Sequence, residues 1–333
     1  MLDWASEQQR LSTLYAQSGS LNAVLDALYQ DQIAAGVLST EILDNLPPIH
    51  TITTGTHSLY LQYNPARSKR GVPDKQHPNP RYMIPFSGGI PCFCCLDHIA
   101  YQWPNERGFH LPVLDQKLVF LPNISPIFSH HFTVVTEDHV AQVMDIRLIL
   151  ATAARLPGYW IIQNGTGAGA TNPWHFHLQA FPFDLPISAF PSEKLLIPRQ
   201  KGLMAAKIDH PATVYKFTLP GEVSLEHITY FTQLQDHYLS ADPDNQLNYL
   251  VRHSAQWEVY FVLRNTRFKT DMYKTGQPGY AEIGGIISTI THSGSDQWIT
   301  EGFSRYEKLL NRVRVDDVIL GGFEGVNGCF LSS

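Results

Sequence analysis

One stretch of the chain decides the fold, residues 164–179, and it reads NGTGAGATNPWHFHLQ. A glycine-rich loop comes first, and a segment follows in which polar side chains at odd positions alternate with apolar side chains at even positions. In an extended strand this period of two places His175, His177 and Gln179 on one face and the apolar side chains on the other. The stretch therefore predicts a strand whose polar face carries two imidazoles and an amide.

These residue types suit the transfer of a phosphoryl or acyl group. A neutral imidazole is a good nucleophile at pH 7 and can pass the group onward, so His177 can hold a covalent phosphoramidate. The three glycines of the loop allow backbone N–H groups to approach a phosphate closely, as in a backbone nest. A His-x-His pair can also consist of two structural histidines, but the glycine loop before it favours the catalytic interpretation.

The segment resembles the active-site strand of the histidine triad superfamily, and His-x-His-x-Gln resembles its transferase branch. This branch contains galactose-1-phosphate uridylyltransferase, diadenosine tetraphosphate phosphorylase and the plant-type GDP-hexose phosphorylases. The resemblance implies that His177 attacks an α-phosphorus and carries the nucleotidyl group, that Gln179 holds a phosphate oxygen, and that His175 belongs to the catalytic motif. Hydrolases of the superfamily have a third His where this chain has Gln179, which disfavours a mononucleotide hydrolase.

The loop before the motif is the expected phosphate-binding element. Its candidate contacts are Asn164, Gly165, Thr166, Gly167 and Gly169. Asn172 stands three residues before His175, one more than in the sugar uridylyltransferases, with Trp174 as the extra residue. This difference leaves the path of the loop open.

The cysteines are clustered, because three of the four are Cys92, Cys94 and Cys95. Cys92 and Cys95 have the C-x-x-C spacing that lets two thiolates chelate one zinc ion, but a tetrahedral site needs two more ligands. No thioredoxin-like pattern surrounds the pair, so a redox site is disfavoured and no redox cofactor is expected.

The resemblance supplies the missing ligands. Sugar uridylyltransferases complete their zinc site with a His after a later strand and with the first His of the motif, and the matching residues here are His139 and His175. We therefore predict a structural Zn²⁺ held by Cys92, Cys95, His139 and His175. The extra cysteine keeps the register open, with two alternates, Cys94 and His98.

Two further segments resemble substrate-binding elements of the transferases. The basic run that contains Arg67 and Arg70 is similar to a run that meets substrate phosphates, and a guanidinium fork matches phosphate oxygens in geometry and charge. A solvated basic turn is the alternative for this run. Asn123, in an Asn-x-x-Pro segment, is implied to contact the ribose or base, whereas His130 and His131 are interpreted as structural turn residues.

Composition limits the class of protein, the partners and the location that the sequence allows. The 333 residues are 44% hydrophobic and 16% charged, which is typical of a compact protein with an ample core. The net charge of -6 argues against a nucleic-acid partner, which would favour a basic surface. Neither a signal-peptide core nor an apolar run of roughly 20 residues is apparent, so we expect a cytoplasmic protein without a membrane partner.

Periodicity predicts the order of elements. Two helices are expected within residues 4–36, with a break at 18–20, and a third helix is expected to start at His139, capped by Asp138, and to run to Leu156. The other expected helices lie near 224–239 and 300–313. Strands are expected at 49–63, 117–121, 131–135, 159–163, 247–252, 257–263 and 280–290.

The resulting expectation is an α+β, histidine-triad-like protein of two tandem half-barrels, each an antiparallel sheet with a helix. Residues 1–48 form an N-terminal helical extension, 49–200 the catalytic half, and 201–333 a second half that is degenerate because it has no His-x-His. The donor would be a nucleoside diphosphate sugar or a dinucleoside polyphosphate. Inorganic phosphate is the favoured acceptor, as in a phosphorylase, and a sugar 1-phosphate is the alternative, as in a hexose-1-phosphate uridylyltransferase.

Two questions stay open at this point. A non-catalytic nucleotide-binding sensor is disfavoured, because such a protein has no need to keep its nucleophile. The resemblance also leaves open whether the chain is a monomer or a homodimer, since relatives include both.

Overall fold

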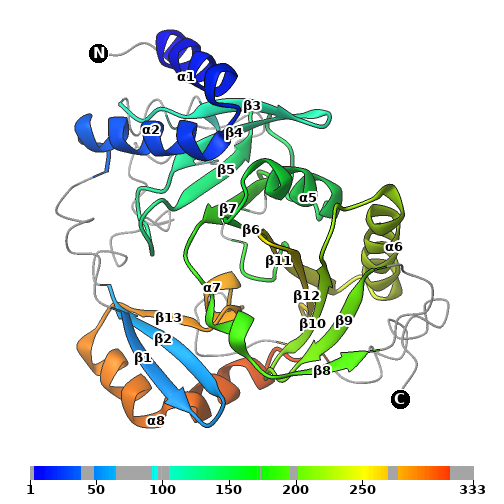
Figure 1. The fold of residues 1–333 in the computed structure, drawn as a ribbon. Coiled ribbons are helices and arrows are strands. Elements are labelled where there is room, and N and C mark those ends of the chain that lie inside the picture. The colour runs from blue at the N-terminus through cyan, green and yellow to red at the C-terminus, as the bar shows by residue number, and fades with distance from the viewer. Residues whose placement is uncertain are drawn as a thin grey trace.

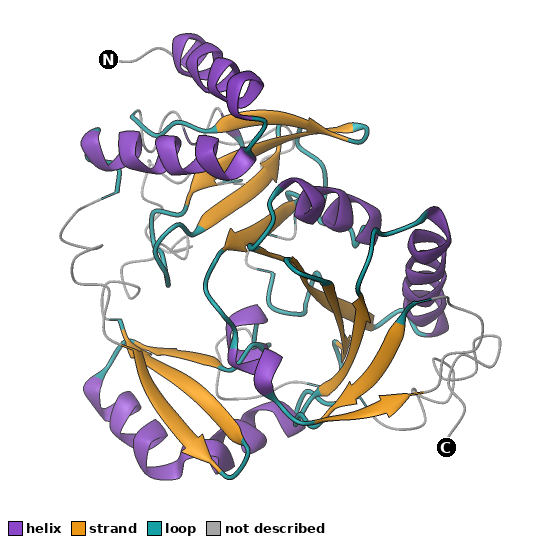
Figure 2. Cartoon of the chain, viewed as in Figure 1, coloured by secondary structure: helices purple, strands orange, loops and turns teal. Residues whose placement is uncertain are grey.

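A ten-stranded sheet runs through the molecule in the order β3-β4-β5-β7-β6-β11-β12-β10-β9-β8 (Figures 1 and 2). Every neighbouring pair in it is antiparallel. Its strands are β3 (Phe109–Val113), β4 (Gln116–Pro122), β5 (Phe132–Thr136), β6 (Trp160–Asn164), β7 (His177–Phe181), β8 (Ser192–Leu195), β9 (Met204–Ile208), β10 (Thr213–Leu219), β11 (Asn245–His253) and β12 (Trp257–Asn265). The computed structural model describes residues 4–38, 49–64, 92, 94–96, 99, 105–170, 172, 174–195, 202–268 and 277–315.

The large sheet consists of two halves with the same topology. The first half has the order β3-β4-β5-β7-β6 and the second β8-β9-β10-β12-β11, so each half orders its five strands first, second, third, fifth and fourth. A helix connects the third strand to the fourth in both halves, α5 (Ile146–Arg155) in the first and α6 (Leu225–Ala241) in the second. The halves meet where β6 pairs with β11. The predicted α+β fold of two tandem half-barrels is confirmed, while the domain boundaries at 48 and 200 stay a prediction.

The two faces of this sheet are covered by different layers. Helices α1 (Trp4–Ser18), α2 (Leu21–Ala34), α5 and α6 share one hydrophobic core with one face of the sheet. The other face packs against a second core, built by the three-stranded sheet β1-β2-β13 and by the helices that accompany it. These elements are β1 (Ile49–Thr54), β2 (His57–Tyr63), η3 (Pro186–Ala189), α7 (Tyr280–Ile283), β13 (Ile286–Thr289) and α8 (His292–Asn311).

The alternation in β7 assigns its side chains to these two faces. Leu178 and Ala180 belong to the core on the helix-covered side. Phe181 belongs to the second core, and His177 and Gln179 share its face because side chains two apart on a strand point the same way. The polar residues of the motif therefore lie on the side of the sheet that faces β1, β2, β13 and α8.

Several predicted elements are confirmed, and others need correction. Ser20 caps α2 at the predicted break between the first two helices. The third helix is present, but its predicted start at His139 and cap at Asp138 are wrong, because α5 starts at Ile146, where the Asp145 carboxylate accepts the N–H groups of Arg147 and Leu148. The strand predicted over 280–290 is also partly wrong, since a short helix, α7, precedes β13 there.

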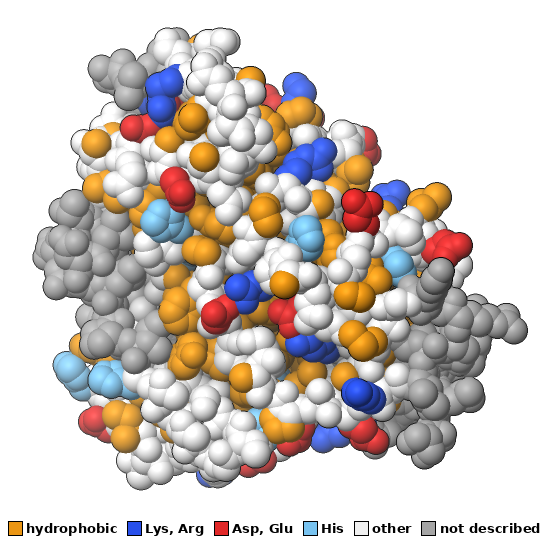
Figure 3. Space-filling view, viewed as in Figure 1, with side chains coloured by type: hydrophobic (Ala, Val, Ile, Leu, Met, Phe, Trp, Pro, Cys, Tyr) orange, Lys and Arg blue, Asp and Glu red, His pale blue; other side chains and the backbone are white. Residues whose placement is uncertain are grey.

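Two surface properties complete the fold. Among the described residues, no helix is long and apolar enough to cross a membrane. Basic and acidic side chains are interspersed on the face drawn in Figure 3, rather than gathered by sign.

Candidate active site

His177 lies at the first position of β7, and its ring has a defined tautomer. The ring Nδ1 is 3.0 Å from the carbonyl oxygen of His175, and a carbonyl only accepts, so Nδ1 carries the hydrogen. In the neutral ring the lone pair is then on Nε2, which is the nucleophilic nitrogen. The side chain is 7% exposed. His175 itself lies before the strand rather than on it, which corrects the expectation that both imidazoles stand on one strand face.

Gln142 fixes the backbone around His177, and sequence reasoning missed it. Its amide oxygen accepts the N–H of His177 at 2.8 Å, and its Nε2 donates to the carbonyl oxygens of His177 and Asn164 at 3.2 and 2.9 Å. The hydroxyl of Thr166 donates to the Gln142 backbone carbonyl at 3.3 Å. Gln142 therefore joins the end of β6, the glycine loop and the start of β7 into one unit.

The amide of Gln179 is oriented by a histidine that we interpreted as a turn residue. His131 accepts the N–H of Ile127 on Nδ1, so its Nε2 carries the hydrogen and donates to Gln179 Oε1 at 2.7 Å. Asn123 donates weakly to the same oxygen at 3.4 Å, and the hydroxyl of Tyr280 lies 3.3 Å from His131 Nε2. With its oxygen held in this way, Gln179 presents its –NH2 group on the face that it shares with His177.

The glycine loop is closely packed against the second half of the protein. The N–H of Gly165 donates to the carbonyl of Leu247 at 2.8 Å. Gly169 has a φ of +95°, and a Cβ on it would lie 2.5 Å from the Cα of Gly279. Glycine is required at 169 both by this left-handed backbone and by the close approach of two chains. The loop is thus held between β11 and the segment before α7.

The predicted substrate contacts divide into two groups. The structure places Asn123, Asn164 and the glycine loop in the region of His177 and Gln179 through the contacts just described. Arg67 and Arg70 lie outside the described residues, as does His98.

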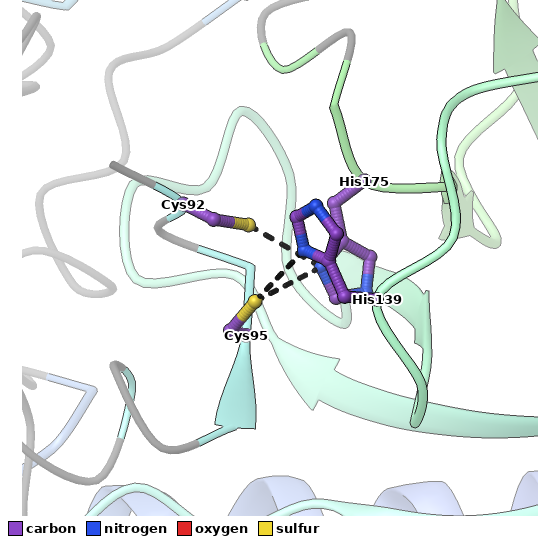
Figure 4. Close-up of side chains that lie close together, drawn as sticks. All are labelled: Cys92, Cys95, His139 and His175. Carbon is purple, nitrogen blue, oxygen red and sulfur yellow. Dashed lines mark hydrogen bonds between the residues drawn. The ribbon is translucent and has the colours of Figure 1, made fainter. Parts of the chain in front are cut away.

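A second cluster joins the motif to the cysteine segment. Sγ of Cys92 and Sγ of Cys95 lie 3.3 and 3.5 Å from Nδ1 of His175, and Sγ of Cys95 lies 3.1 Å from Nδ1 of His139 (Figure 4). All four ligand atoms lie within 4.8 Å of one another. The Nε2 of His175 is 2.8 Å from the carbonyl of Thr136, so Nε2 carries the hydrogen and Nδ1 turns its lone pair to the thiols. The four side chains could together hold a metal ion.

The distances and the donor set fit zinc. With Zn–S of about 2.3 Å and Zn–N of about 2.0–2.1 Å, a tetrahedral ion separates sulfur and nitrogen ligands by about 3.5 Å. The hydrogen bond from Cys95, helped by the one from Asn172, outweighs burial and lowers the pKa of the Cys92 thiol to about 3. Cys94 is buried nearby but is not part of the four-residue cluster, so the observed register is the one first predicted.

The non-helical path of residues 139–145 explains how His139 reaches this cluster. The N–H of Phe176 donates to the carbonyl of Val140 at 2.6 Å, which holds the segment beside the turn before β7. Val140 and Val143 are 37% and 55% exposed, although their spacing suggested the buried face of a helix. The sequence offers no local signal for this path, because it depends on pairing with residues more than thirty positions away.

The strand of the second half that corresponds to β7 has no histidine. β12 occupies in the second half the place of β7 in the first, and its side chains on the corresponding face include Tyr260, Val262 and Arg264. This agrees with a second half that has no His-x-His.

Comparisons with known proteins agree with the fold. A family model described as a domain of unknown function, DUF4922, matches residues 39–182. No curated protein matches the sequence. The structure of yeast Ap4A phosphorylase Apa2 in complex with AMP is similar, with a TM-score of 0.55 and 15% identity over 87% of this chain and 94% of that chain. Its complex with Ap4A has a TM-score of 0.55 and 14% identity over 87% and 95% of the two chains.

At this level of identity the likeness concerns the fold. It extends over both halves of the large sheet, since it covers 87% of the chain. This chain therefore shares its two-half fold with the yeast Ap4A phosphorylase Apa2.

Proposed function

We propose that this protein is a nucleotidyltransferase of the phosphorylase type, which cleaves a nucleoside diphosphate sugar or a dinucleoside polyphosphate through a covalent intermediate on His177. The observation that carries the proposal is the fixed tautomer of His177 next to an oriented Gln179. The yeast phosphorylase with the same fold binds AMP and Ap4A, which supports a nucleotide substrate.

The first step forms a bond between His177 and the nucleotide. The lone pair on Nε2 attacks the α-phosphorus, the P–N bond forms, and the P–O bond to the leaving phosphate breaks with its electron pair on that oxygen. The ring then carries a positive charge, which the carbonyl of His175 stabilises through Nδ1–H. The –NH2 of Gln179 donates to an oxygen of the transferred group, where negative charge accumulates.

The second step reverses the first with a new nucleophile. An oxygen of inorganic phosphate attacks the same phosphorus, the P–N bond breaks, and its electrons return to Nε2. The products are a nucleoside diphosphate and the neutral His177. A double displacement through one nucleophile predicts ping-pong kinetics. In this proposal Arg67, Arg70 and the glycine loop bind phosphates, and Asn123 contacts the ribose or base.

The metal ion is proposed to be a structural Zn²⁺. Cys92, Cys95, His139 and His175 would hold it, and the bound ion would crosslink the cysteine segment to the turn before β7. Since His175 also provides the carbonyl that sets the tautomer of His177, the same cluster positions the nucleophile.

Intact-protein mass spectrometry tests the covalent step. The protein is incubated briefly with UDP-glucose, UDP-galactose, GDP-glucose, GDP-galactose or Ap4A, and His177→Ala is the control. We expect an acid-labile mass increase of one nucleoside monophosphate that the control lacks, and the mass names the base. Nucleotide binding without an adduct from any donor would contradict the transferase and favour a sensor.

A hexose-1-phosphate uridylyltransferase is the second candidate, and the Cys–His cluster is the observation in its favour, because the resembling site belongs to sugar uridylyltransferases. The isolated adduct distinguishes the two. Discharge by inorganic phosphate with release of a nucleoside diphosphate supports the phosphorylase, whereas discharge only by a hexose 1-phosphate supports the uridylyltransferase.

A further inference from the structure

Arg264 on β12 is a buried guanidinium without a carboxylate partner. Arg264 is 1% exposed. Among the described residues, no carboxylate oxygen lies within 4.0 Å of its guanidinium nitrogens, the distance that defines an ion pair. It donates instead to three neutral oxygens, those of the Asn248 side chain, the Pro278 carbonyl and the Gln277 side chain, at 3.0, 2.9 and 2.6 Å. Its Nε–H has no partner among the described residues.

A charge in this state is unusual because burial without a counter-charge is costly. Burial lowers the pKa of Arg264 to about 10, and the carboxylate of Glu282 opposes the shift from a distance, so the group stays protonated at neutral pH. The structural alternative is a side chain that only fills space, and an apolar residue would do that at lower cost. The second half thus keeps a buried positive charge that forms no ion pair with its described acidic residues, although Glu282 acts on it from a distance.

The hydrogen-bond partners of Arg264 connect it to both walls of the proposed site, which are the glycine loop and the 277–280 segment. Asn248, which accepts from Arg264, donates through its Nδ2 to the side chain of Asn164 at 2.6 Å and to the carbonyl of Ala168 at 2.7 Å. Asn164 and Ala168 belong to the glycine loop. Pro278 belongs to the segment that leads into Tyr280, whose hydroxyl meets His131.

The two walls are also in direct contact with each other. The backbones of Gly169 and Gly279 approach so closely that a Cβ on either would meet atoms of the other segment. The N–H of Gly279 is held by the Glu282 carboxylate at 2.9 Å. A small displacement of one wall would therefore displace the other, and Arg264 bonds directly to the 277–280 segment and, through Asn248, to the glycine loop.

We propose that Arg264 is a positioning residue for polyphosphate binding: it holds the 277–280 segment directly and the glycine loop through Asn248, and it supplies a positive charge without an ion-pair partner behind them. The anionic phosphates of a nucleotide add a counter-charge to that of the more distant Glu282 carboxylate. This inference rests on the proposed function, because it places the phosphates against the glycine loop.

The test compares each nucleoside with its 5′-diphosphate, so that the two ligands differ only in the diphosphate group. Isothermal titration measures the Kd of adenosine, guanosine and uridine and of their 5′-diphosphates for the wild-type protein and for Arg264→Gln, Arg264→Lys and Arg252→Gln. Arg252 is the matched control, since it lies on the neighbouring strand β11 and its charge is paired with Asp184. Thermal denaturation confirms that each variant is folded.

We expect Arg264→Gln to lower the preference for diphosphate over nucleoside on the order of tenfold, as a charge interaction in a partly desolvated site would give. Arg264→Lys should keep most of the preference, because it keeps the charge, and Arg252→Gln should keep all of it. An equal loss of affinity for nucleoside and diphosphate would show a merely structural role and overturn the inference. So would an unchanged preference in Arg264→Gln, or an equal loss in Arg264→Lys.

Failure of this inference and failure of the proposed function give different results. If the wild-type protein forms the adduct on His177 but its Arg264 variants keep the phosphate preference, only the role of Arg264 is wrong. If the wild-type protein binds no nucleotide, the proposed function fails and the inference fails with it.

Discussion

His131 offers the sharpest test of how the site is organised, because the structure assigns separate tasks to its two ring nitrogens. Nδ1 accepts the N–H of Ile127 at 3.3 Å, and Nε2–H donates to Gln179 Oε1 at 2.7 Å. An asparagine at this position can replace Nδ1 as an acceptor but is too short to reach Gln179. A glutamine reaches the place of Nε2 and keeps the donor. The two substitutions therefore remove one bond each.

The expected effect follows from the bond that orients Gln179. A net hydrogen bond between neutral groups is worth about 0.5–1.5 kcal/mol, and its loss lets the Gln179 amide rotate away from the transferred phosphate. The rate of His177 nucleotidylation should fall about threefold to tenfold in His131→Asn. It should stay within about twofold of the wild-type rate in His131→Gln, since 0.4 kcal/mol is about a factor of two.

The adjacent His130 provides the control. It has a φ of +54°, which asparagine tolerates well, and its Nε2 lies 3.6 Å from an Asp26 carboxylate oxygen on α2. The assay is the time course of adduct mass after rapid quenching, with a donor that the wild-type protein accepts. Equal rates for His131→Asn and His130→Asn, or an equal loss in His131→Asn and His131→Gln, would refute the assigned orientation of Gln179.

Three further predictions concern the metal, the loop and pH. Cys95→Ser should lose bound zinc by elemental analysis and lower the Tm, whereas Cys94→Ser should keep the metal. Gly169→Ala should lower the free energy of unfolding, measured in urea, by about 2–4 kcal/mol, because the added Cβ makes a close contact at a residue with a φ of +95°. The control Gly36→Ala has a φ of +71° but open space around it, and should lower the free energy of unfolding by only about 1 kcal/mol. Burial lowers the pKa of His210 from 6.5 to about 4, so the unfolded chain binds the proton at a higher pH than the folded protein. The free energy of unfolding should therefore fall by about 3 kcal/mol as the pH drops from 6.5 to 4. His210→Gln should flatten this part of the dependence of the free energy of unfolding on pH.

Local patterns in the sequence were sufficient for much of the site. The alternation after position 176 predicts which side chains of β7 share a face, and that face is observed. The C-x-x-C spacing and the resemblance together predict the four residues that cluster around a common point. The first inference depends only on a short segment whose own residues determine its geometry, whereas the second needed the resemblance, because His139 and His175 are distant from the cysteines in sequence.

The misses have a common physical cause, which is that tertiary pairing overrides local periodicity. Residues 139–145 have apolar residues at helical spacing, yet the N–H groups of Phe176 and His177 donate to Val140 and Gln142 and hold the segment outside a helix. The role of His131 depends on Gln179, which is 48 positions away. The pairing of β2 with β13 is more distant still, and no local signal predicts it.

The two halves of the sheet have the same topology but unequal tasks, and this inequality follows from how they join. Because β6 pairs with β11, the glycine loop that follows β6 lies against the second half, where Leu247 and Asn248 bind it. In the proposed mechanism a nucleophile is needed on only one side of this junction, and it is His177 on β7. We propose that β12 contributes Arg264 instead, which holds the 277–280 segment directly and the glycine loop through Asn248, and whose positive charge attracts the phosphates.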